Sequence, residues 1–272
     1  MCFNAVFIGN IALDVNSFYY GKKEEQLRTN NIGGACFYSA IPASLFYRVG
    51  MVGKVGSDFD INIFSKYNVD TKGIKIYSNE KTISFHQIYK SKNQKIRKVE
   101  EYLNPILVIM EEDIPREYLK SKYIHITTNE PEVQLKLVKF IRKNSNAIIS
   151  IDTIDGYSKE KTTKEVFDLV DIAFIDKEFT NLINCKAKVK IIKKGAEGCD
   201  YVSDNQQFSI DVVKTKVVDK TGAGDCMNGV FINLIANGWE EKEALKMATR
   251  VATESIKENG IEHLKRKNIH NL

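Results

Sequence analysis

Cysteine is scarce in this chain of 272 residues and is not arranged in pairs. The five cysteines are odd in number, widely separated and free of any Cys-x-x-Cys spacing: Cys2, Cys36, Cys185, Cys199 and Cys226. This pattern argues against a disulfide framework or a zinc module and favours a reducing compartment, so we expect a cytoplasmic protein. The four histidines also show no metal-binding spacing.

Long apolar runs and charge of one dominant sign are missing as well. No apolar stretch reaches the length that spans a membrane, and the N-terminus enters a strand-like segment without a signal peptide. The 40 basic and 35 acidic residues are largely interspersed, and no nucleic-acid-binding motif is present. We therefore expect neither a membrane nor a nucleic acid as a partner.

The signatures of two large phosphate-binding classes are absent too. The chain contains no Walker P-loop and no protein-kinase set of His-Arg-Asp and Asp-Phe-Gly motifs. Phosphate handling would therefore fall to a different element. The best candidate is the glycine-rich turn Gly222-Ala223-Gly224-Asp225.

This turn lies between an extended and a helical pattern. Residues 208–218 alternate and are rich in Val and Ile, which predicts a strand, and apolar residues then recur at helical spacing from Met227 to Ile235. Gly222 and Gly224 permit a tight backbone and leave room for a ligand. Because the first amides of a helix have no partner within it and lie at the positive end of its dipole, the turn predicts an anion site, most naturally for phosphate.

Asp225 has two interpretations at this point. A carboxylate at a helix start often acts as a cap, because its oxygens accept hydrogen bonds from the unpaired amides. Beside a phosphate site it could instead act as a general base that takes a proton from an attacking hydroxyl. The turn by itself leaves both alternatives open.

The same stretch resembles a known family. Its pattern is Asp219-x-Thr221-Gly222-Ala223-Gly224-Asp225-x-x-x-Gly229. It is similar to the C-terminal signature of the ribokinase-like (PfkB) carbohydrate kinases, although Met227 stands where that family usually has Phe. The resemblance implies that Asp225 is the catalytic base and that the backbone amides of Gly222, Ala223, Gly224 and Asp225 form an anion hole.

A second polar element follows the first apolar run. Ala5–Gly9 predicts a buried strand, after which Asn10 and Asp14 appear. Ligands gather at the carboxyl ends of parallel strands, so Asp14 is well placed to meet one, although a turn-forming aspartate is the alternative. The resemblance implies that Asp14 accepts hydrogen bonds from substrate hydroxyls and that Asn10 belongs to the same site.

A glycine pair, Gly33-Gly34, precedes an apolar helical pattern and would let the backbone approach a ligand closely. It resembles the Gly-Gly-x-x-x-Asn element of the family, whose Asn binds sugar hydroxyls, but Tyr38 occupies that position here. The resemblance implies substrate contacts from Gly33, Gly34 and Tyr38, and the departure argues against a simple ribokinase-type substrate. This variant is similar to archaeal inositol-kinase-like members.

The prediction of a nucleotide-binding site rests on the family resemblance alone. Gly195-Ala196-Glu197-Gly198 resembles the family's glycine turn, which implies ATP with Mg²⁺ as cofactors. The implied nucleotide contacts are Lys194, Gly195, Gly198, Thr221 and Gly224. The family's Asn-x-x-Glu element organises magnesium and its waters; because the glutamate is displaced by one position here, Glu178 is a candidate for that role through water.

Strand and helix patterns alternate from residue 123 onward, with a short helix expected over 177–184 and a long one over 241–259. This alternation predicts a parallel sheet covered by helices on both faces. Two strand-like segments, 81–89 and 95–102, predict a hairpin. Together with segment 15–32, this hairpin would form a small lid sheet outside the main core. The alternative is that Ile83, Phe85 and Tyr89 belong to the main core.

The resemblance covers nearly the whole chain and implies one α/β domain over residues 1–272. Its architecture would be ribokinase-like, three-layered α/β/α, with a mostly parallel central sheet, a small β lid from segments 15–32 and 81–102, and a homodimer formed through that lid. The motifs together favour an ATP-dependent kinase of a small hydroxylated substrate. The alternative is a binding or regulatory protein that kept the fold and lost the chemistry, which Tyr38 and the displaced Glu178 would explain.

The expected substrate is a neutral polyhydroxylated molecule such as a sugar, inositol or nucleoside. A buried carboxylate at Asp14 attracts hydroxyl donors and repels phosphate. A second phosphate would need an arginine cluster, and Arg28 alone lies in the relevant segments. Four aromatic residues are expected to form apolar walls for a ring: Tyr20, Phe37, Tyr38 and Phe85.

Overall fold

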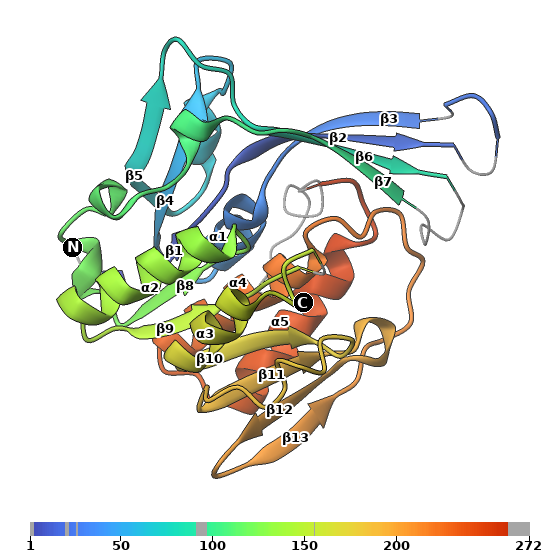
Figure 1. The fold of residues 1–272 in the computed structure, drawn as a ribbon. Coiled ribbons are helices and arrows are strands. Elements are labelled where there is room, and N and C mark those ends of the chain that lie inside the picture. The colour runs from blue at the N-terminus through green and yellow to red at the C-terminus, as the bar shows by residue number, and fades with distance from the viewer. Residues whose placement is uncertain (1–2, 20–21, 26, 91–96, 155, 261–272) are drawn as a thin grey trace.

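Two sheets organise the protein, as seen in a computed structural model that describes residues 3–19, 22–25, 27–90, 97–154 and 156–260 (Figure 1). Within these residues the larger sheet has nine strands in the order β13-β12-β11-β10-β9-β8-β1-β4-β5. Their bounds are β1 Ala5–Ile8, β4 Val49–Gly56, β5 Val69–Tyr77, β8 Tyr123–Ile126, β9 Ile148–Ile151, β10 Ile172–Asp176, β11 Val189–Lys193, β12 Cys199–Ser203 and β13 Gln207–Ile210. Pairing is parallel from β5 to β11 and antiparallel for β12 and β13, so the predicted mostly parallel sheet is confirmed.

Helices cover both faces of this sheet, which confirms the three-layer architecture. The α-helices are α1 Ala35–Ser44, α2 Pro131–Asn144, α3 Lys161–Leu169, α4 Ala223–Ala236 and α5 Glu241–Ser255. Short 3₁₀ helices are η1 Ile61–Lys66, η2 Pro105–Leu107, η3 Glu111–Asp113, η4 Tyr118–Lys120 and η5 Gly195–Glu197. Side chains alternate along β1, so Ala5 and Phe7 join the core of α1, α4 and α5, whereas Val6 and Ile8 join the core of α2 and α3.

The smaller sheet forms the lid and projects from the main body above α4 and α5 (Figure 1). Its strands are β2 Ala12–Phe18, β3 Leu27–Gly33, β6 Ser84–Tyr89 and β7 Arg97–Tyr102, in the order β3-β2-β6-β7. β6 and β7 pair antiparallel, as the predicted hairpin requires, and β2 pairs parallel with β6. Tyr89 stacks on Phe18 within the lid, and Ile83 belongs to a small separate cluster with Ala12 and Leu107, so placing these residues in the main core was wrong.

Helix α4 places the turn predicted to bind phosphate, Gly222-Ala223-Gly224-Asp225, which we call the phosphate-binding turn. It is buried along almost its whole length between α1 and α5. A side chain at Gly229 would overlap the carbonyl oxygen of Ser39 in α1, so this glycine permits the close approach of the two helices. The tight packing fixes where the N-terminus of α4 points.

Three sequence expectations about secondary structure need correction. Residues 177–184 form successive turns instead of a helix, with hydrogen bonds such as Leu182 N to Phe179 O, because Thr and Asn in this segment favour turns over helix interiors. The strand expected over 208–218 ends at Ile210, beyond which Val213 is 79% exposed and has no sheet neighbour to bury it. The last long helix ends at Ser255, before Gly260.

Among the described residues, no helix combines the length and the apolar character needed to cross a membrane.

Candidate active site

A cavity of about 640 Å³ lies between the lid and the start of α4. Its lining brings together four of the five predicted substrate residues, Asn10, Asp14, Gly34 and Tyr38, with Asp225; Gly33 does not line it. The turn residues Thr221 and Gly222 line it as well. Segments more than 200 residues apart in the chain therefore meet at one site, as the carboxyl-end rule for parallel sheets predicts.

The phosphate-binding turn has the backbone geometry that the glycines were expected to allow. Gly222 is the N-cap of α4 and adopts a left-handed conformation with φ of 72°, which favours glycine strongly. A side chain at Gly222 would also overlap the ring of Tyr38. The turn and Tyr38 are thus in direct contact, and Gly222 is required for that contact.

Free amides are present in this turn, but not at every predicted position. The Ala223 amide donates to the carbonyl of Lys220 at 3.2 Å, so it is already engaged. The amides of Gly222, Gly224 and Asp225 have no acceptor within the described parts of the chain. Three donors at the positive end of a helix of 14 residues remain available to an anion.

Asp225 lies in the first turn of α4 and reaches the cavity. No side chain caps α4, and the carboxylate of Asp225 accepts no hydrogen bond from any described residue, so the capping interpretation has no support in the geometry. Burial raises the pKa of Asp225 to about 8, and the negative charge of Asp152 adds to the shift, while Lys193 opposes it. An unpaired carboxylate of this kind binds a proton readily near neutral pH.

Asp14 is the second carboxylate of the cavity. It lies on β2, is 3% exposed, and its Oδ1 has no hydrogen-bond partner among the described residues. Burial raises its pKa to about 7. Gly33 is adjacent on β3, and a side chain there would overlap the Asp14 carboxylate.

Tyr38 lies beside Asp14 and ends in an equally unpaired group. Its hydroxyl is buried without a hydrogen-bond partner among the described residues, and no hydrogen bond of normal geometry joins it to Asp14. Burial, together with the charge of Asp14, raises the pKa of Tyr38, so its hydroxyl stays protonated. Asp14 and Tyr38 therefore offer an acceptor and a donor to a ligand in the cavity.

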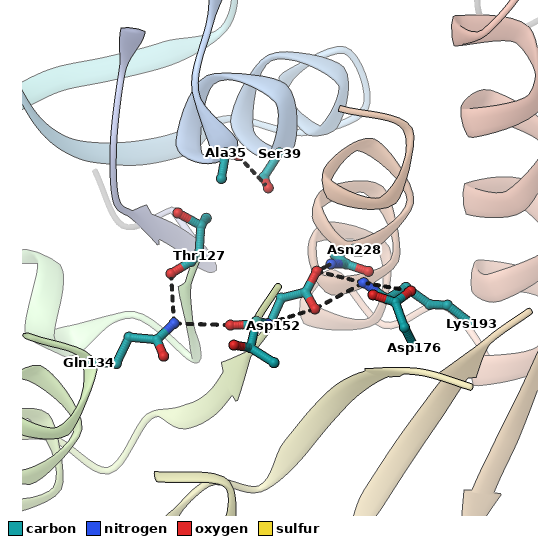
Figure 2. Close-up of polar contacts among 9 residues, drawn as sticks. Ala35, Ser39, Thr127, Gln134, Asp152, Asp176, Lys193 and Asn228 are labelled. Atoms are coloured by element: carbon teal, nitrogen blue, oxygen red, sulfur yellow. Dashed lines mark hydrogen bonds and ion pairs between the residues drawn. The ribbon is translucent and has the colours of Figure 1, made fainter. Parts of the chain in front are cut away.

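A cluster that the sequence analysis missed joins Asp152, Asp176 and Lys193 to Asn228 of α4 (Figure 2). Lys193, at the end of β11, contacts both carboxylate oxygens of Asp152 at 2.9 and 2.8 Å and lies 3.7 Å from Asp176. Asn228 of α4 donates to Asp152 at 2.6 Å. Burial lowers the pKa of Lys193, but the two carboxylates outweigh this effect and raise it, so the ammonium stays charged.

Lys193 is close to the phosphate-binding turn itself. A β-carbon on Gly224 would lie 3.6 Å from the Lys193 ammonium. Asp152, Asp176 and Lys193 each follow or end a strand of the parallel sheet. The same carboxyl-end rule that drew attention to Asp14 could have found them.

Four of the predicted nucleotide residues, Lys194, Gly195, Gly198 and Gly224, do not line the cavity. Lys194 pairs with Asp200 at 2.6 Å, and the η5 turn of Gly195 and Gly198 has positive φ angles of 59° and 87°. A β-carbon on Gly195 would contact nothing within 4 Å, so the turn is open at Gly195, whereas one on Gly198 would overlap the carbonyl oxygen of Ile210. Thr221 lines the cavity and donates its amide to Asp219 at 2.9 Å.

Glu178 is exposed in the turn after β10, next to Asp176. No cluster of three or more His, Cys, Asp or Glu side chains suited to a metal ion occurs in the part of the chain that the structure describes. A magnesium ion that travels with nucleotide phosphates needs only one or two protein carboxylates, so this observation does not conflict with the expected role.

The pattern of the pfkB family of carbohydrate kinases matches residues 3–267. The chain belongs to this family. A cytidine kinase from Thermococcus kodakarensis is 26% identical over 279 residues, covering 94% of this chain and 96% of its own length. A 5-dehydro-2-deoxygluconokinase from Clostridium perfringens is 27% identical over 294 residues, covering 92% of this chain and 86% of its own.

The fold is shared with solved members of the family. An Arabidopsis thaliana ribokinase, solved with ribose and ATP, superimposes with a TM-score of 0.76 at 16% identity, covering 96% of this chain and 94% of its own. The ribokinase-like α/β fold is therefore confirmed. As a pfkB carbohydrate kinase the chain is a phosphotransferase with an alcohol group as acceptor, and its relatives support a sugar or nucleoside kinase activity.

Proposed function

We propose that this pfkB kinase transfers the γ-phosphoryl group of ATP to a hydroxyl of a small neutral polyhydroxylated substrate, with Asp225 as the general base. The observation that carries the proposal is that Asp225, at the N-terminus of α4, shares one cavity with Asp14. Each brings a carboxylate that pairs with no cation from the described residues.

The charges of the cavity support a neutral substrate. Its lining includes four acidic side chains and one basic side chain: Asp14, Glu101, Glu130, Asp225 and Lys220. Arg28, the single arginine considered in the lid, is exposed on β3 and does not line it. A phosphorylated sugar would bring a second dianion into this field without the arginines that such groups need.

Apolar side chains suit the cavity to a ring. Ile83, Phe85, Leu107 and Tyr157 line it, together with the Tyr38 side chain. Phe37, which was also expected there, is fully buried in the main core, and Tyr20 lies outside the described residues. These walls fit the face of a pyranose, an inositol or a nucleoside base.

The phosphoryl transfer would proceed as follows. Asp225 accepts the proton of the substrate hydroxyl as that oxygen forms a bond to the γ-phosphorus. The bond between the γ-phosphorus and the bridging oxygen breaks, and its electron pair leaves with ADP. The amides of Gly222, Gly224 and Asp225 would stabilise the charge that develops on the transferred group, with Lys193 as a nearby fixed cation.

ATP and Mg²⁺ are the cofactors of this proposal. Lys194, Gly195 and Gly198, on the turn after β11, are the residues proposed to hold the nucleotide, with Thr221 and Gly224 on the phosphate side. Asp176 and Glu178 are the carboxylates available to magnesium and its waters. Magnesium would neutralise charge on the β- and γ-phosphates. The homodimer through the lid stays a prediction.

The competing proposal is a binding protein without catalysis. It rested on Tyr38 and the displaced Glu178, but Tyr38 takes part in the cavity beside Asp14, so its presence does not remove the substrate site. The kinase relatives and the complete turn favour the enzyme.

A substrate screen tests this proposal. Purified protein is incubated with ATP, Mg²⁺ and ribonucleosides, inositols, hexoses or fructose 6-phosphate, and ADP formation is followed alongside ³¹P NMR of the product. We expect phosphorylation of at least one neutral member. Preference for fructose 6-phosphate would contradict the neutral-substrate assignment, and nucleotide binding without any turnover would favour the binding protein.

A further inference from the structure

The lid and the phosphate-binding turn are joined by a buried set of hydrogen bonds. Asn16 on β2 donates from Nδ2 to Asp219 Oδ2 at 3.0 Å, and the other oxygen of Asp219 accepts the Thr221 amide at 2.9 Å. Tyr89 on β6 places its hydroxyl 3.0 Å from Thr221 Oγ1. The two inner strands of the lid thus hold both ends of the segment that precedes Gly222.

The direction of these bonds follows from proton counting. The Tyr89 hydroxyl donates its one proton to Gln87 Oε1 at 3.0 Å. It must therefore accept from the Thr221 hydroxyl, which donates in the remaining contact. The result is a continuous chain from Thr221 through Tyr89 to Gln87.

This chain of hydrogen bonds connects the substrate cavity with the turn at the start of α4. Gln87 and Thr221 both line the substrate cavity, and Thr221 immediately precedes the left-handed Gly222. Tyr89 is 3% exposed, and its ring stacks on Phe18 with centroids 4.9 Å apart. The Tyr89 hydroxyl is therefore held rigidly where the lid meets the turn, and water does not compete for its hydrogen bonds.

We propose that Tyr89 is a positioning residue, whose hydroxyl holds the phosphate-binding turn in register with the lid. The inference rests on the proposed kinase function of that turn. A substrate that contacts Gln87 would then be linked to the orientation of the Gly222, Gly224 and Asp225 amides. Tyr89 itself does not line the cavity.

The test compares Tyr89→Phe, Thr221→Val and the double variant. Each single change removes the Tyr89–Thr221 bond, and Tyr89→Phe keeps the ring that stacks on Phe18. We expect kcat to fall about five- to tenfold in each single variant, because each loses the Tyr89–Thr221 hydrogen bond. In Tyr89→Phe, which changes no proposed nucleotide contact, the KM for ATP should change by less than about twofold. Tyr89→Phe also removes the bond to Gln87, and Thr221→Val also removes the 3.5 Å contact from Asn16. The double variant should still lose less than the two single losses combined, since the shared Tyr89–Thr221 bond can be lost only once.

Tyr102→Phe is the matched control, because Tyr102 is 47% exposed on β7 of the same lid and does not line the cavity. Its kcat should match the parent. Additive losses in the double variant, or an unchanged kcat in Tyr89→Phe, would overturn the proposal.

Hydrogen exchange separates this proposal from the kinase function. Peptides that cover residues 219–225 should exchange about fivefold faster in Tyr89→Phe than in the parent or in Tyr102→Phe, with no ligand present. If the parent phosphorylates nothing, the kinase proposal fails while the exchange rates still decide the role of Tyr89. Equal exchange in all three proteins would show that the hydroxyl does not position the turn.

Discussion

Two groups of buried or half-buried carboxylates flank the phosphate-binding turn, and they differ in whether a cation pairs with them. On the cavity side, Asp14 and Asp225 have no ion-pair partner among the described residues, and burial raises both of their pKa values. On the inner side, Asp152 is held by Lys193, Asn228 and the Thr153 amide. From this difference we expect Asp14 and Asp225 to interact with ligands and the Lys193–Asp152 pair to support the fold as well.

The contrast has an energetic basis. Ionising a buried carboxylate that has no cation nearby is costly. Such a group therefore occurs where a ligand pairs with it or a proton neutralises it. A buried ion pair such as Lys193–Asp152 contributes little net stability, but removing one partner leaves a charge uncompensated. Substitutions of Asp14 or Asp225 should therefore affect turnover first, whereas substitutions of Asp152 or Lys193 should affect folding stability as well.

The largest effect is expected at Asp225. Asp225→Asn keeps the shape of the side chain and removes the base, so kcat should fall by about two to four orders of magnitude with ATP binding retained. Steady-state kinetics and nucleotide titration measure the two quantities. Asp204→Asn, in an exposed position between β12 and β13, is the control. Turnover within a few-fold of the parent would remove Asp225 from the role of base.

The inner side is tested by Lys193→Met. The Lys193 side chain is 12% exposed and that of Asp152 is 5% exposed, so the change leaves buried negative charge without a cation. We expect a loss of about 3–5 kcal/mol in the free energy of unfolding, measured by denaturant titration.

Lys177→Met is the matched control for this loss, because Lys177 pairs with Glu197 at 2.6 Å on the surface. Its cost should be far smaller than that of Lys193→Met, because solvent screens an exposed pair. Similar losses in the two variants would show that Lys193 is no more important to the fold than a surface lysine.

Two glycines of the turn provide the next comparison. A side chain at Gly224 would make ordinary contact with Lys193, whereas one at Gly222 would overlap Tyr38 and require a positive φ. Gly224→Val should therefore fold and lose about 10²–10³ in kcat, because the side chain obstructs the phosphate and its amide is one of the predicted donors.

Gly222→Val should lower the melting temperature instead, through strain and the clash with Tyr38. Thermal unfolding and kcat measured on both variants separate these outcomes. A fully active, folded Gly224→Val protein would contradict the anion hole.

The substrate side is expected to show a smaller effect. Asp14→Ala removes an acceptor for substrate hydroxyls, so the substrate KM should rise about tenfold or more while the KM for ATP stays within about twofold. Full kinetics with both substrates varied provide the measurement. An unchanged substrate KM would place Asp14 outside the binding site.

Local patterns were sufficient to predict much of this site. The glycine turn, the strand before Asp14 and the glycine pair before α1 each have a signal within a few residues, and their family resemblance placed them in one fold. The same patterns predicted the lid hairpin. The helix expected over 177–184 failed because its apolar residues, Phe179 and Leu182, are buried by successive turns.

Interactions between distant segments could not be predicted in this way. Lys193 pairs with Asp152, 41 residues away, because β9, β10 and β11 are neighbours in the sheet. Tyr89 meets Thr221 across 132 residues, because the lid lies against the start of α4. No spacing within the sequence encodes either contact; both depend on the strand order and on the docking of the lid.

The smallest expected effect is the pH dependence of kcat/KM near neutrality. An ordinary carboxyl group, with a pKa near 4, would be fully ionised from about pH 6 upward and would leave the profile flat. Burial instead raises the pKa of Asp225 to about 8, so the base is lost as the pH falls through that value. From pH 8 to pH 7 the ionised fraction, and with it kcat/KM, should drop about fivefold.

Asp14 should add a second ionisation to this profile, because its pKa is raised to about 7 and its charged form is the better acceptor of substrate hydroxyls. The logarithm of kcat/KM should therefore rise with a slope of two below pH 7 and of one between about pH 7 and 8. In Asp14→Asn the lower step should disappear and the step near pH 8 should remain. A parent profile that is flat down to pH 5 would mean that neither carboxylate is the unpaired, ligand-directed group that distinguishes the cavity side from the Lys193 side.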